Sequence, residues 1–242
     1  MSNLLVEIGN TAVKAAWSEG ATLGKTLRYQ GEMVIDFLKS VLEKETPEVM
    51  AVVSSKPLED EDAEFLRGRC QYLMLLHNGN EEFLQRYGLP EYLSYDRAAS
   101  LVAAKYLFKG KACSIFDFGT TLTVDFVDSG GFYKGGNISP GCRTRFKSLN
   151  RYSKSLPLVD TPEKEPREGY SIESSIEAGV ISGMVFEIEG YIGLHPQNIV
   201  IFTGGDAVYF AKRMKNSIFV VSNMVLIGLA LITDDYVRKN LQ

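Results

Sequence analysis

The first half of the chain alternates short apolar runs with amphipathic stretches. Apolar runs bounded by turn residues predict strands, whereas apolar positions three and four residues apart predict helices. The pair Gly9-Asn10 separates two such runs and is typical of a hairpin turn. We expect a strand pair at 4–8 and 12–17, a helix at 33–43 and a strand at 50–53. A second helix between 53 and 72, a strand at 72–76 and an alanine-rich helix at 96–108 should follow.

The second half continues this alternation and contains two long helical stretches. The pattern predicts three short strands at 112–116, 121–127 and 132–134, followed by a long helix at 174–194. It then predicts a fourth strand at 199–202, a shorter helix that ends at residue 214, and a second long helix at 223–241. The segment 157–169 contains three prolines and many charged residues, so we expect an exposed loop there.

Strands interleaved with helices and hairpins predict mixed α/β layers with a partly antiparallel sheet. A weak internal repeat indicates that the fold is duplicated. Residues 7–11 and 117–121 share the pattern acid-x-Gly-x-Thr, and each copy closes one apolar strand and opens another. We interpret the copies as two versions of one fold unit that meet near Gly110. The expected domains are therefore 1–110 and 111–242.

Charge and composition argue against several classes of protein. The net charge is −4 and no basic stripe stands out, which argues against a nucleic-acid partner. Cys70, Cys113 and Cys142 are far apart and the chain has two histidines, so free or buried thiols are a simpler interpretation than a zinc site. No window reaches the length of a membrane span, and Met1 leads almost directly into a strand. We expect a cytoplasmic protein without a membrane partner.

The two acid-x-Gly-x-Thr turns have the chemistry of a phosphate site. A glycine lets the backbone approach a phosphate, and neighbouring amides and the side chains of Asn10 or Thr11 can donate to phosphate oxygens. The acid at the strand end can hold a hydrated Mg²⁺, and Lys14 can offset triphosphate charge. Each turn alone could be an ordinary hairpin. Two copies on matching strands favour phosphate binding.

Asp96 and Arg97 lie side by side at the start of a predicted helix. A carboxylate there can deprotonate a substrate hydroxyl, and the guanidinium can pair with a substrate carboxylate. The alternative is a helix-start acid followed by a surface arginine. The glycine-rich stretches 135–141 and 203–205 could bring the backbone close to a ligand, and 203–205 would suit a flat group such as adenine. Each stretch could equally be a tight connection between two elements.

Together these stretches resemble the type III pantothenate kinase family. The family turn Asp-Ile-Gly-Asn-Thr-x-x-Lys is matched by residues 7–14, and Asp-x-Gly-Thr-x-x-Thr by 117–123. Residues 135–141 are similar to the family stretch Gly-Gly-x-Ile-x-Pro-Gly. Residues 87–97 keep the spacing of the family motif Tyr-x-x-Pro-x-x-x-Gly-x-Asp-Arg. The resemblance covers essentially the whole chain.

The resemblance implies an α/β fold of two duplicated ribonuclease H-like domains with mixed sheets, in the actin-like ATPase architecture. It implies ATP-dependent phosphorylation of pantothenate, the first step of coenzyme A biosynthesis, with Mg²⁺ and a monovalent cation (K⁺ or NH₄⁺), by a homodimer. Asp96 would be the catalytic proton acceptor, and Asp117 would bind the monovalent cation. The residues implied for ATP are Glu7, Ile8, Gly9, Asn10, Thr11, Ala12, Val13, Lys14 and Thr120. Those implied for pantothenate are Tyr87, Ser94, Tyr95, Asp96, Arg97 and Ile172.

Three positions depart from the family pattern. Glu7 stands where the family has Asp, Ser94 replaces a glycine, and Ile172 stands where the family has a threonine that binds pantothenate. Two alternatives therefore stay open. One is a catalytically impaired, kinase-like accessory or regulatory protein, and the other is a kinase for another small hydroxy compound. An assay of ADP formation with several substrates distinguishes these two alternatives from a pantothenate kinase.

Overall fold

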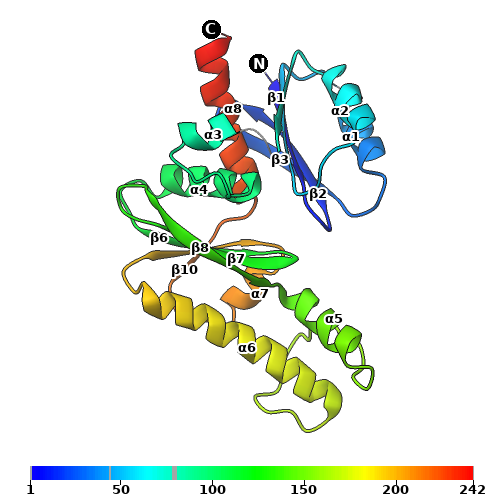
Figure 1. Ribbon diagram of the computed structural model, residues 1–242, viewed down its shortest axis with the longest axis vertical. Coiled ribbons are helices and arrows are strands. Elements are labelled where there is room, and N and C mark those ends of the chain that lie inside the picture. Colours follow the sequence, from blue (N-terminus) through cyan, green and yellow to red (C-terminus); the bar gives the residue numbers. More distant parts are fainter. Residues whose placement is uncertain (1, 44, 78–80, 242) are drawn as a thin grey trace. The chain divides into compact units, whose positions relative to one another are not determined.

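The computed structural model describes residues 2–43, 45–77 and 81–241, and the chain folds into two compact units (Figure 1). The first unit comprises Met1–Leu107 together with Asn223–Gln242, and the second comprises Phe108–Ser222. Each unit contains one five-stranded mixed sheet with helices packed on it. Within the described part of the chain, no helix has the length and apolar character needed to cross a membrane.

The sheet of the first unit has the strand order β3-β2-β1-β4-β5. Its strands are β1 (Ser2–Ile8), β2 (Val13–Glu19), β3 (Thr22–Tyr29), β4 (Val49–Ser54) and β5 (Tyr72–Leu76). β2 pairs antiparallel to both β1 and β3, whereas β4 pairs parallel to β1 and β5 parallel to β4. The carboxyl ends of β1 and β4 therefore lie at the same edge of the sheet.

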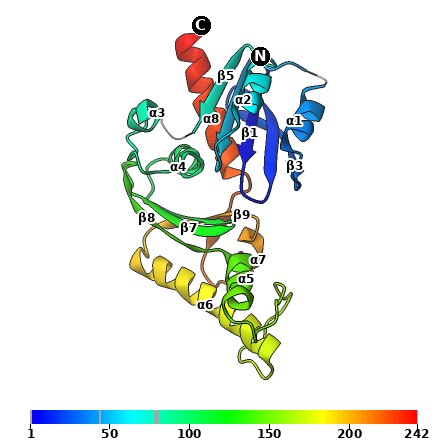
Figure 2. The same cartoon turned by 45° about the vertical axis from the view of Figure 1, so that its right-hand side comes forward.

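Helices pack on this sheet because its strands carry apolar residues on both faces (Figure 2). They are α1 (Val34–Leu42), α2 (Asp60–Arg67), α3 (Glu81–Arg86), α4 (Tyr95–Leu107) and α8 (Met224–Asn240). Leu4 and Val6 of β1 form one buried cluster with Leu38 of α1 and Leu66 of α2. Alternate residues of a strand point to the opposite face. Leu5 accordingly belongs to the other face, and α8, which packs on α4, contacts β1.

The sheet of the second unit has the strand order β10-β9-β6-β7-β8. Its strands are β6 (Cys113–Phe118), β7 (Thr121–Val127), β8 (Tyr133–Pro140), β9 (Ile199–Gly204) and β10 (Ile218–Val220), and its helices are α5 (Cys142–Tyr152), α6 (Ile172–Leu194) and α7 (Ala207–Ala211). The core joins aromatic residues of the sheet to one face of α6. The Phe202 ring contacts those of Phe116 and Phe118 at an angle, and the three rings pack in one cluster with Ile181 and Met184.

The two sheets have the same topology. Read as β8-β7-β6-β9-β10, the second sheet repeats the first, with three antiparallel strands followed by two parallel additions. The predicted fold class of two mixed α/β halves is therefore confirmed. The two acid-x-Gly-x-Thr turns occupy equivalent positions, between the first and second strand of each sheet.

The expected domain limits differ from the observed units at the C-terminus. The chain was expected to divide at residue 110, with everything beyond it in the second domain, but Asn223–Gln242 belongs to the first unit. The reason is a helix contact that local sequence does not reveal. α8 buries Leu226, Leu229 and Ala230 and lies so close to α4 that Gly228 contacts the Ala99 backbone.

Most of the predicted strands and helices are confirmed, and the elements that were missed are short or poorly buried. β3 has no buried residue, so it shows no clear alternation of apolar and polar positions. The strand expected at 132–134 is the start of β8, which continues to Pro140 without a buried residue. α5 buries only Cys142 and Phe146, and β10 has three residues. α3 was not predicted either. The segment 157–169 forms a loop, as expected.

We expect Gly228→Ala to lower the free energy of unfolding by about 1 to 3 kcal/mol, because a buried methyl group that does not fit forces the backbone to shift. A Cβ at residue 228 would lie 2.5 Å from the Ala99 carbonyl carbon. Urea denaturation measures the change. Gly190→Ala in α6 is the matched control, since its Cβ would meet no atom within 4 Å. An equal effect of both variants would contradict the close packing of α8 on α4.

Candidate functional site

The first glycine turn joins β1 to β2 in the first unit. The Gly9 N–H donates to Ala12 O at 2.9 Å, which closes the turn. Just before the glycine, Ile8 O accepts hydrogen bonds from the N–H of Ser55 at 2.9 Å and from its hydroxyl at 3.2 Å. Ser55 directly follows β4, the parallel neighbour of β1. The adjacent strand therefore fixes the position at which the chain leaves the sheet.

The second glycine turn joins β6 to β7 and is held in the same way. The Gly119 N–H donates to Thr121 O at 3.0 Å. Phe118 O, just before the glycine, accepts from the N–H groups of Gly205 at 2.8 Å and Asp206 at 3.4 Å, which directly follow β9. Both turns thus rest on a carbonyl anchored by the chain after the next parallel strand. This equivalence supports the sequence interpretation of two related turns.

The charges beside the two turns have diverged. Glu7 lies opposite Lys14 in the β1–β2 ladder, and Lys14 Nζ is 3.0 Å from Glu7 Oε2, with both side chains mostly buried. In the second unit, Asp117 lies opposite Thr123. Only the first turn therefore has a cation opposite its acid in the ladder. The longer side chain of Glu7, where the family has Asp, is held by this ion pair.

Asp117 lies beside a glycine that must remain a glycine. Gly204 has φ +91°, and a Cβ there would lie 2.5 Å from Asp117 Oδ1. Asp117 and Gly204 sit in neighbouring parallel strands, where Asp117 pairs with Thr203. A side chain at residue 204 would therefore collide with the Asp117 carboxylate and with the Phe118 backbone. The expected 203–205 turn therefore lies directly beside the Asp117 carboxylate.

Asp96 is in the first turn of α4. Its Oδ1 accepts a hydrogen bond from the Arg97 N–H at 2.8 Å, and its side chain is half-buried. The positive end of the helix dipole favours a carboxylate here. Arg97 is 9% exposed, while Ser94 is exposed and its carbonyl accepts from the Ala98 N–H at 2.9 Å. Asp96 and Arg97 therefore both lie in the first turn of α4, where the Asp96 carboxylate is bonded to the backbone of Arg97.

Tyr87 and Tyr95 are brought together by an aromatic side chain that the sequence did not single out. The ring of Phe83 lies 5.1 Å from that of Tyr87 and 5.7 Å from that of Tyr95. The Tyr87 hydroxyl donates to Asp235 of α8 at 3.5 Å. Burial raises the pKa of Tyr87 to about 12, and the Asp235 carboxylate adds to the rise. Asp235 could not be found locally, since it is at the far end of the chain.

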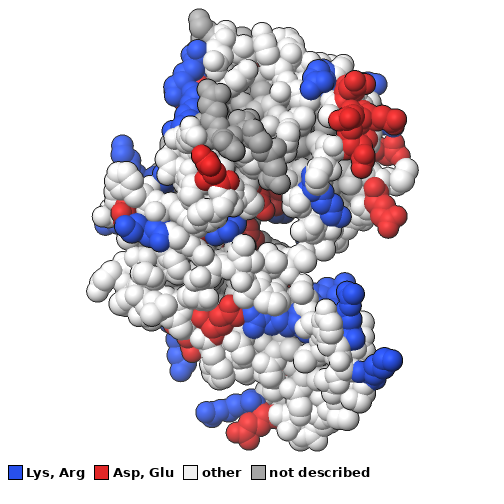
Figure 3. All heavy atoms as spheres, viewed as in Figure 1, with Lys and Arg blue, Asp and Glu red and all other residues white. Residues whose placement is uncertain are grey.

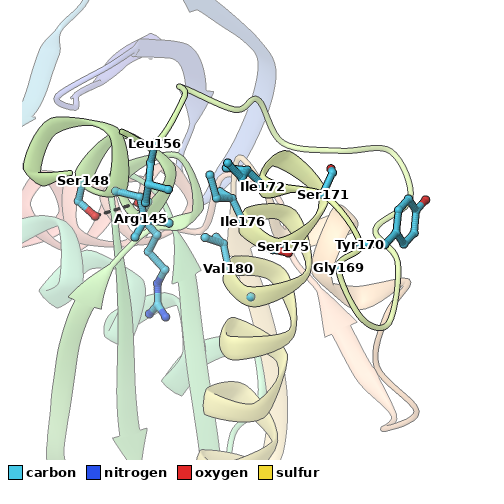
Figure 4. A pocket seen from close by; sticks show the side chains of 12 residues that line it. Arg145, Ser148, Leu156, Gly169, Tyr170, Ser171, Ile172, Ser175, Ile176 and Val180 are labelled. Carbon is cyan, nitrogen blue, oxygen red and sulfur yellow. Dashed lines mark hydrogen bonds between the residues drawn. The ribbon is translucent and has the colours of Figure 1, made fainter. Parts of the chain in front are cut away.

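Unlike the other expected substrate residues, Ile172 lies in the second unit. It begins α6, is 57% exposed, and lines a cavity of about 970 Å³ between α5, the following loop and α6 (Figure 4). In this view Ile172, Ile176 and Val180 point toward Leu156, whereas Tyr170 points away. The cavity wall near Ile172 is therefore largely apolar.

The start of α6 is fixed by a capping box. The Ser171 hydroxyl accepts from the Ser174 N–H at 3.1 Å, and the Ser174 hydroxyl accepts from the Ser171 N–H at 2.8 Å. Such reciprocal bonds satisfy backbone donors that a helix start leaves unpaired. The Ser171 hydroxyl next to Ile172 is thus engaged in capping.

The loop 157–169 is anchored to α7. Arg213 donates to both carboxylate oxygens of Glu165 at 2.7 to 3.1 Å and lies 3.5 Å over the Tyr209 ring. The Tyr209 hydroxyl donates to Pro162 O at 2.8 Å. The sequence predicted an exposed loop but gave no sign of this attachment, because the partners are 47 and 48 residues apart.

Charged side chains gather on different helices of the two units. Figure 3 shows acidic side chains over α2, which begins with Asp60, Glu61 and Asp62, and basic ones over α5, whose sequence has three arginines and a lysine but no acid. Two of the α5 arginines are paired, Arg143 with Asp160 and Arg145 with Glu187. α5 directly follows β8, so this basic helix starts beside the second turn.

The described residues contain no group of three or more His, Cys, Asp or Glu side chains arranged to hold a metal ion. All three cysteines are free. Burial raises the pKa of Cys113 and of Cys142 to about 11, so both thiols stay protonated at neutral pH. Neither has the low pKa of a reactive thiolate.

Comparison with known proteins points to one family. The family model described as Type III pantothenate kinase matches residues 3–193. A type III pantothenate kinase from Flavobacterium psychrophilum is 35% identical over 231 residues, which cover 93% of this chain and 96% of that protein. One from Bacteroides fragilis is 36% identical over 232 residues, covering 94% and 95%.

Solved structures of low identity share the fold alone. One of them is an activator of 2-hydroxyisocaproyl-CoA dehydratase from Clostridium difficile, solved with bound ADPNP. It aligns with a TM-score of 0.60 at 13% identity, and the alignment covers 100% of this chain and 97% of the activator. Neighbours of this kind confirm the predicted actin-like ATPase fold.

The raised pKa of Tyr87 predicts a loss of stability at high pH. The folded protein holds the Tyr87 phenol proton up to about pH 12, whereas an unfolded tyrosine loses it near pH 10. The contribution of this proton to the free energy of unfolding is therefore present below about pH 10 and disappears as the pH rises toward 12. Tyr87→Phe should flatten this part of the curve of unfolding free energy against pH. Tyr152→Phe, at a tyrosine that is 83% exposed, controls for removal of a phenol. A Tyr87→Phe curve parallel to that of the wild type would refute the assignment.

Proposed function

Because the chain belongs to the type III pantothenate kinase family, we propose that its two glycine turns bind ATP and that Asp96 accepts the proton of the pantothenate hydroxyl. The protein is a pantothenate kinase and phosphorylates pantothenate in coenzyme A biosynthesis. The observation that carries the residue assignment is the common anchoring of the two turns, at Ile8 O and at Phe118 O.

ATP is assigned to residues 7–14 and to Thr120. A glycine at the tip of each turn leaves room for phosphate oxygens beside the backbone. Lys14 supplies a positive charge, although its ion pair with Glu7 must loosen or be shared when phosphate binds. Thr120 is exposed on the second turn and can donate its hydroxyl. Phosphoryl transfer depends mostly on positioning and on offsetting charge, so these groups are suited to the reaction.

The carboxylates Glu7 and Asp117 are suited to hard cations, since Mg²⁺ and K⁺ prefer oxygen ligands. Glu7 would hold water molecules of a hydrated Mg²⁺, and Asp117, near the carboxyl end of β6, would hold a monovalent cation. When bound, these cations offset negative charge on the phosphates. The extra methylene of Glu7 relative to Asp is compatible with contact through water, since such contact tolerates a longer side chain better than direct coordination.

Pantothenate is assigned to Tyr87, Ser94, Tyr95, Asp96, Arg97 and Ile172. Asp96 would take the proton of the primary hydroxyl as it attacks the γ-phosphate, and Arg97 would pair with the pantothenate carboxylate. An almost buried guanidinium binds a carboxylate more strongly than an exposed one, because water screens the charges less. Ile172 offers apolar contact alone, and the adjacent Ser171 hydroxyl is engaged in the capping box.

A homodimer and a cytoplasmic location complete the proposal. Ile172, Phe186 and Leu194 of α6 are large apolar side chains that are 57% to 70% exposed in the single chain. Exposed apolar residues along one helix favour an interface. The cytoplasm supplies the ATP that the reaction consumes. The alternative of an impaired accessory protein rests on the three departures from the family pattern, and the wild-type turnover measured in the two assays below tests it.

Asp96→Asn should lower kcat by about 100- to 10,000-fold, the usual effect of removing a positioned general base, with little change in the KM for ATP. A coupled assay of ADP formation with pantothenate measures both constants. Asp36→Asn is the matched control, because Asp36 also lies in the first turn of a helix, α1, and has no proposed role. Turnover of Asp96→Asn close to that of the wild type would return Asp96 to a purely structural role.

Replacing Na⁺ with K⁺ or NH₄⁺ should raise the activity of the wild type, and Asp117→Asn should blunt this response because the neutral amide attracts a cation less. The same assay, run in the three chloride salts at constant ionic strength, measures the response. Asp128→Asn is the control, since that carboxylate accepts from Gly130 and Phe132 in an exposed turn. If the wild-type rate is identical in all three salts, Asp117 has no cation to hold.

A further inference from the structure

The carbonyl of Thr120 receives two hydrogen bonds from the start of α5. The Gly141 N–H donates to Thr120 O at 3.0 Å, and the Thr144 hydroxyl donates to the same oxygen at 2.6 Å. Gly141 is the N-cap residue of α5, and Thr144 lies in its first turn. A carbonyl oxygen has two lone pairs, so both can be used here. No sequence signal singled out Thr144.

The turn and the helix start are in direct contact. A Cβ at residue 141 would lie 2.9 Å from Thr120 O and closer still to Gly119 O, so only glycine fits. The helix start is itself fixed, because Arg145 Nε donates to Pro140 O at 2.8 Å and the same guanidinium pairs with Glu187 of α6. α5 can therefore serve as a rigid support for the turn.

The two donors determine how the Thr120–Thr121 peptide is oriented. In a trans peptide the C=O and the following N–H point in opposite directions. A Thr120 carbonyl held toward α5 therefore turns the Thr121 N–H away from the helix. The direction of a turn amide decides whether it can donate to a phosphate oxygen. The position of the Thr120 side chain on the same turn is restricted as well.

We propose that Thr144 is a positioning residue for ATP: its hydroxyl fixes the Thr120 carbonyl, so that the second turn keeps the orientation in which it binds phosphate. This rests on the proposed role of that turn in ATP binding. Thr144 acts through Thr120 and touches no substrate. Its loss should weaken ATP binding and leave pantothenate binding intact.

The test compares Thr144→Val, which keeps the shape and removes the donor, with Thr144→Ser, which keeps the donor. Loss of one hydrogen bond should raise the KM for ATP by about 2- to 13-fold in Thr144→Val, with the KM for pantothenate unchanged. Thr144→Ser should restore the wild-type KM for ATP. Asn150→Leu is the control, since Asn150 of α5 donates to Leu156 O at 2.9 Å, away from the turn.

A purely structural role predicts a different pattern. Thr144→Val and Asn150→Leu would then lower the melting temperature alike and leave the KM for ATP unchanged, which overturns the inference. An equal rise of both KM values in Thr144→Val, or no rescue by Thr144→Ser, also overturns it.

Thr120→Ala separates this inference from the proposed function. If Thr120→Ala raises the KM for ATP and Thr144→Val does not, the turn binds ATP but Thr144 does not position it. If neither variant raises the KM for ATP, the proposed role of the second turn fails together with the inference.

Discussion

Two backbone carbonyls fix the geometry on which the rest of this protein depends. Ile8 O and Phe118 O each lie at the end of a strand, directly before a glycine, and each is held by donors that follow the adjacent parallel strand. A chain that leaves a sheet at such a point can place a tight turn at the sheet edge, and glycine keeps that edge open to a ligand. The shared strand order of both sheets places these carbonyls in equivalent positions.

The two copies share a scaffold but differ in chemistry. Opposite the strand-end acid, the first copy has Lys14 and the second has Thr123. Beside the acid, the second copy has a left-handed glycine, Gly204, and its turn is further supported by Thr144 of α5. A duplicated fold can therefore vary the side chains beside each turn while keeping the backbone support of each turn.

The sequence was informative where structure follows from local patterns. The apolar runs, the glycine turns and the acid at the start of α4 each have a cause within a few residues, and all were found. The supporting partners depend on contacts between distant segments. Ser55 is 47 residues from Ile8, Asp235 is 148 from Tyr87, and Thr144 is 24 from Thr120. α8 was assigned to the wrong half for the same reason, because packing on α4 decides its place. Edge strands such as β3 were missed because none of their residues is buried, which leaves no clear alternation.

The central proposal is that the two glycine turns bind ATP. The most direct measurement titrates the ¹⁵N-labelled protein with Mg²⁺ and a non-hydrolysable ATP analogue and follows the amide signals of Gly9 and Gly119. The account predicts that both signals shift and that the two shifts follow one saturation curve. A Gly9 or Gly119 signal that stays unchanged while the other saturates would contradict it.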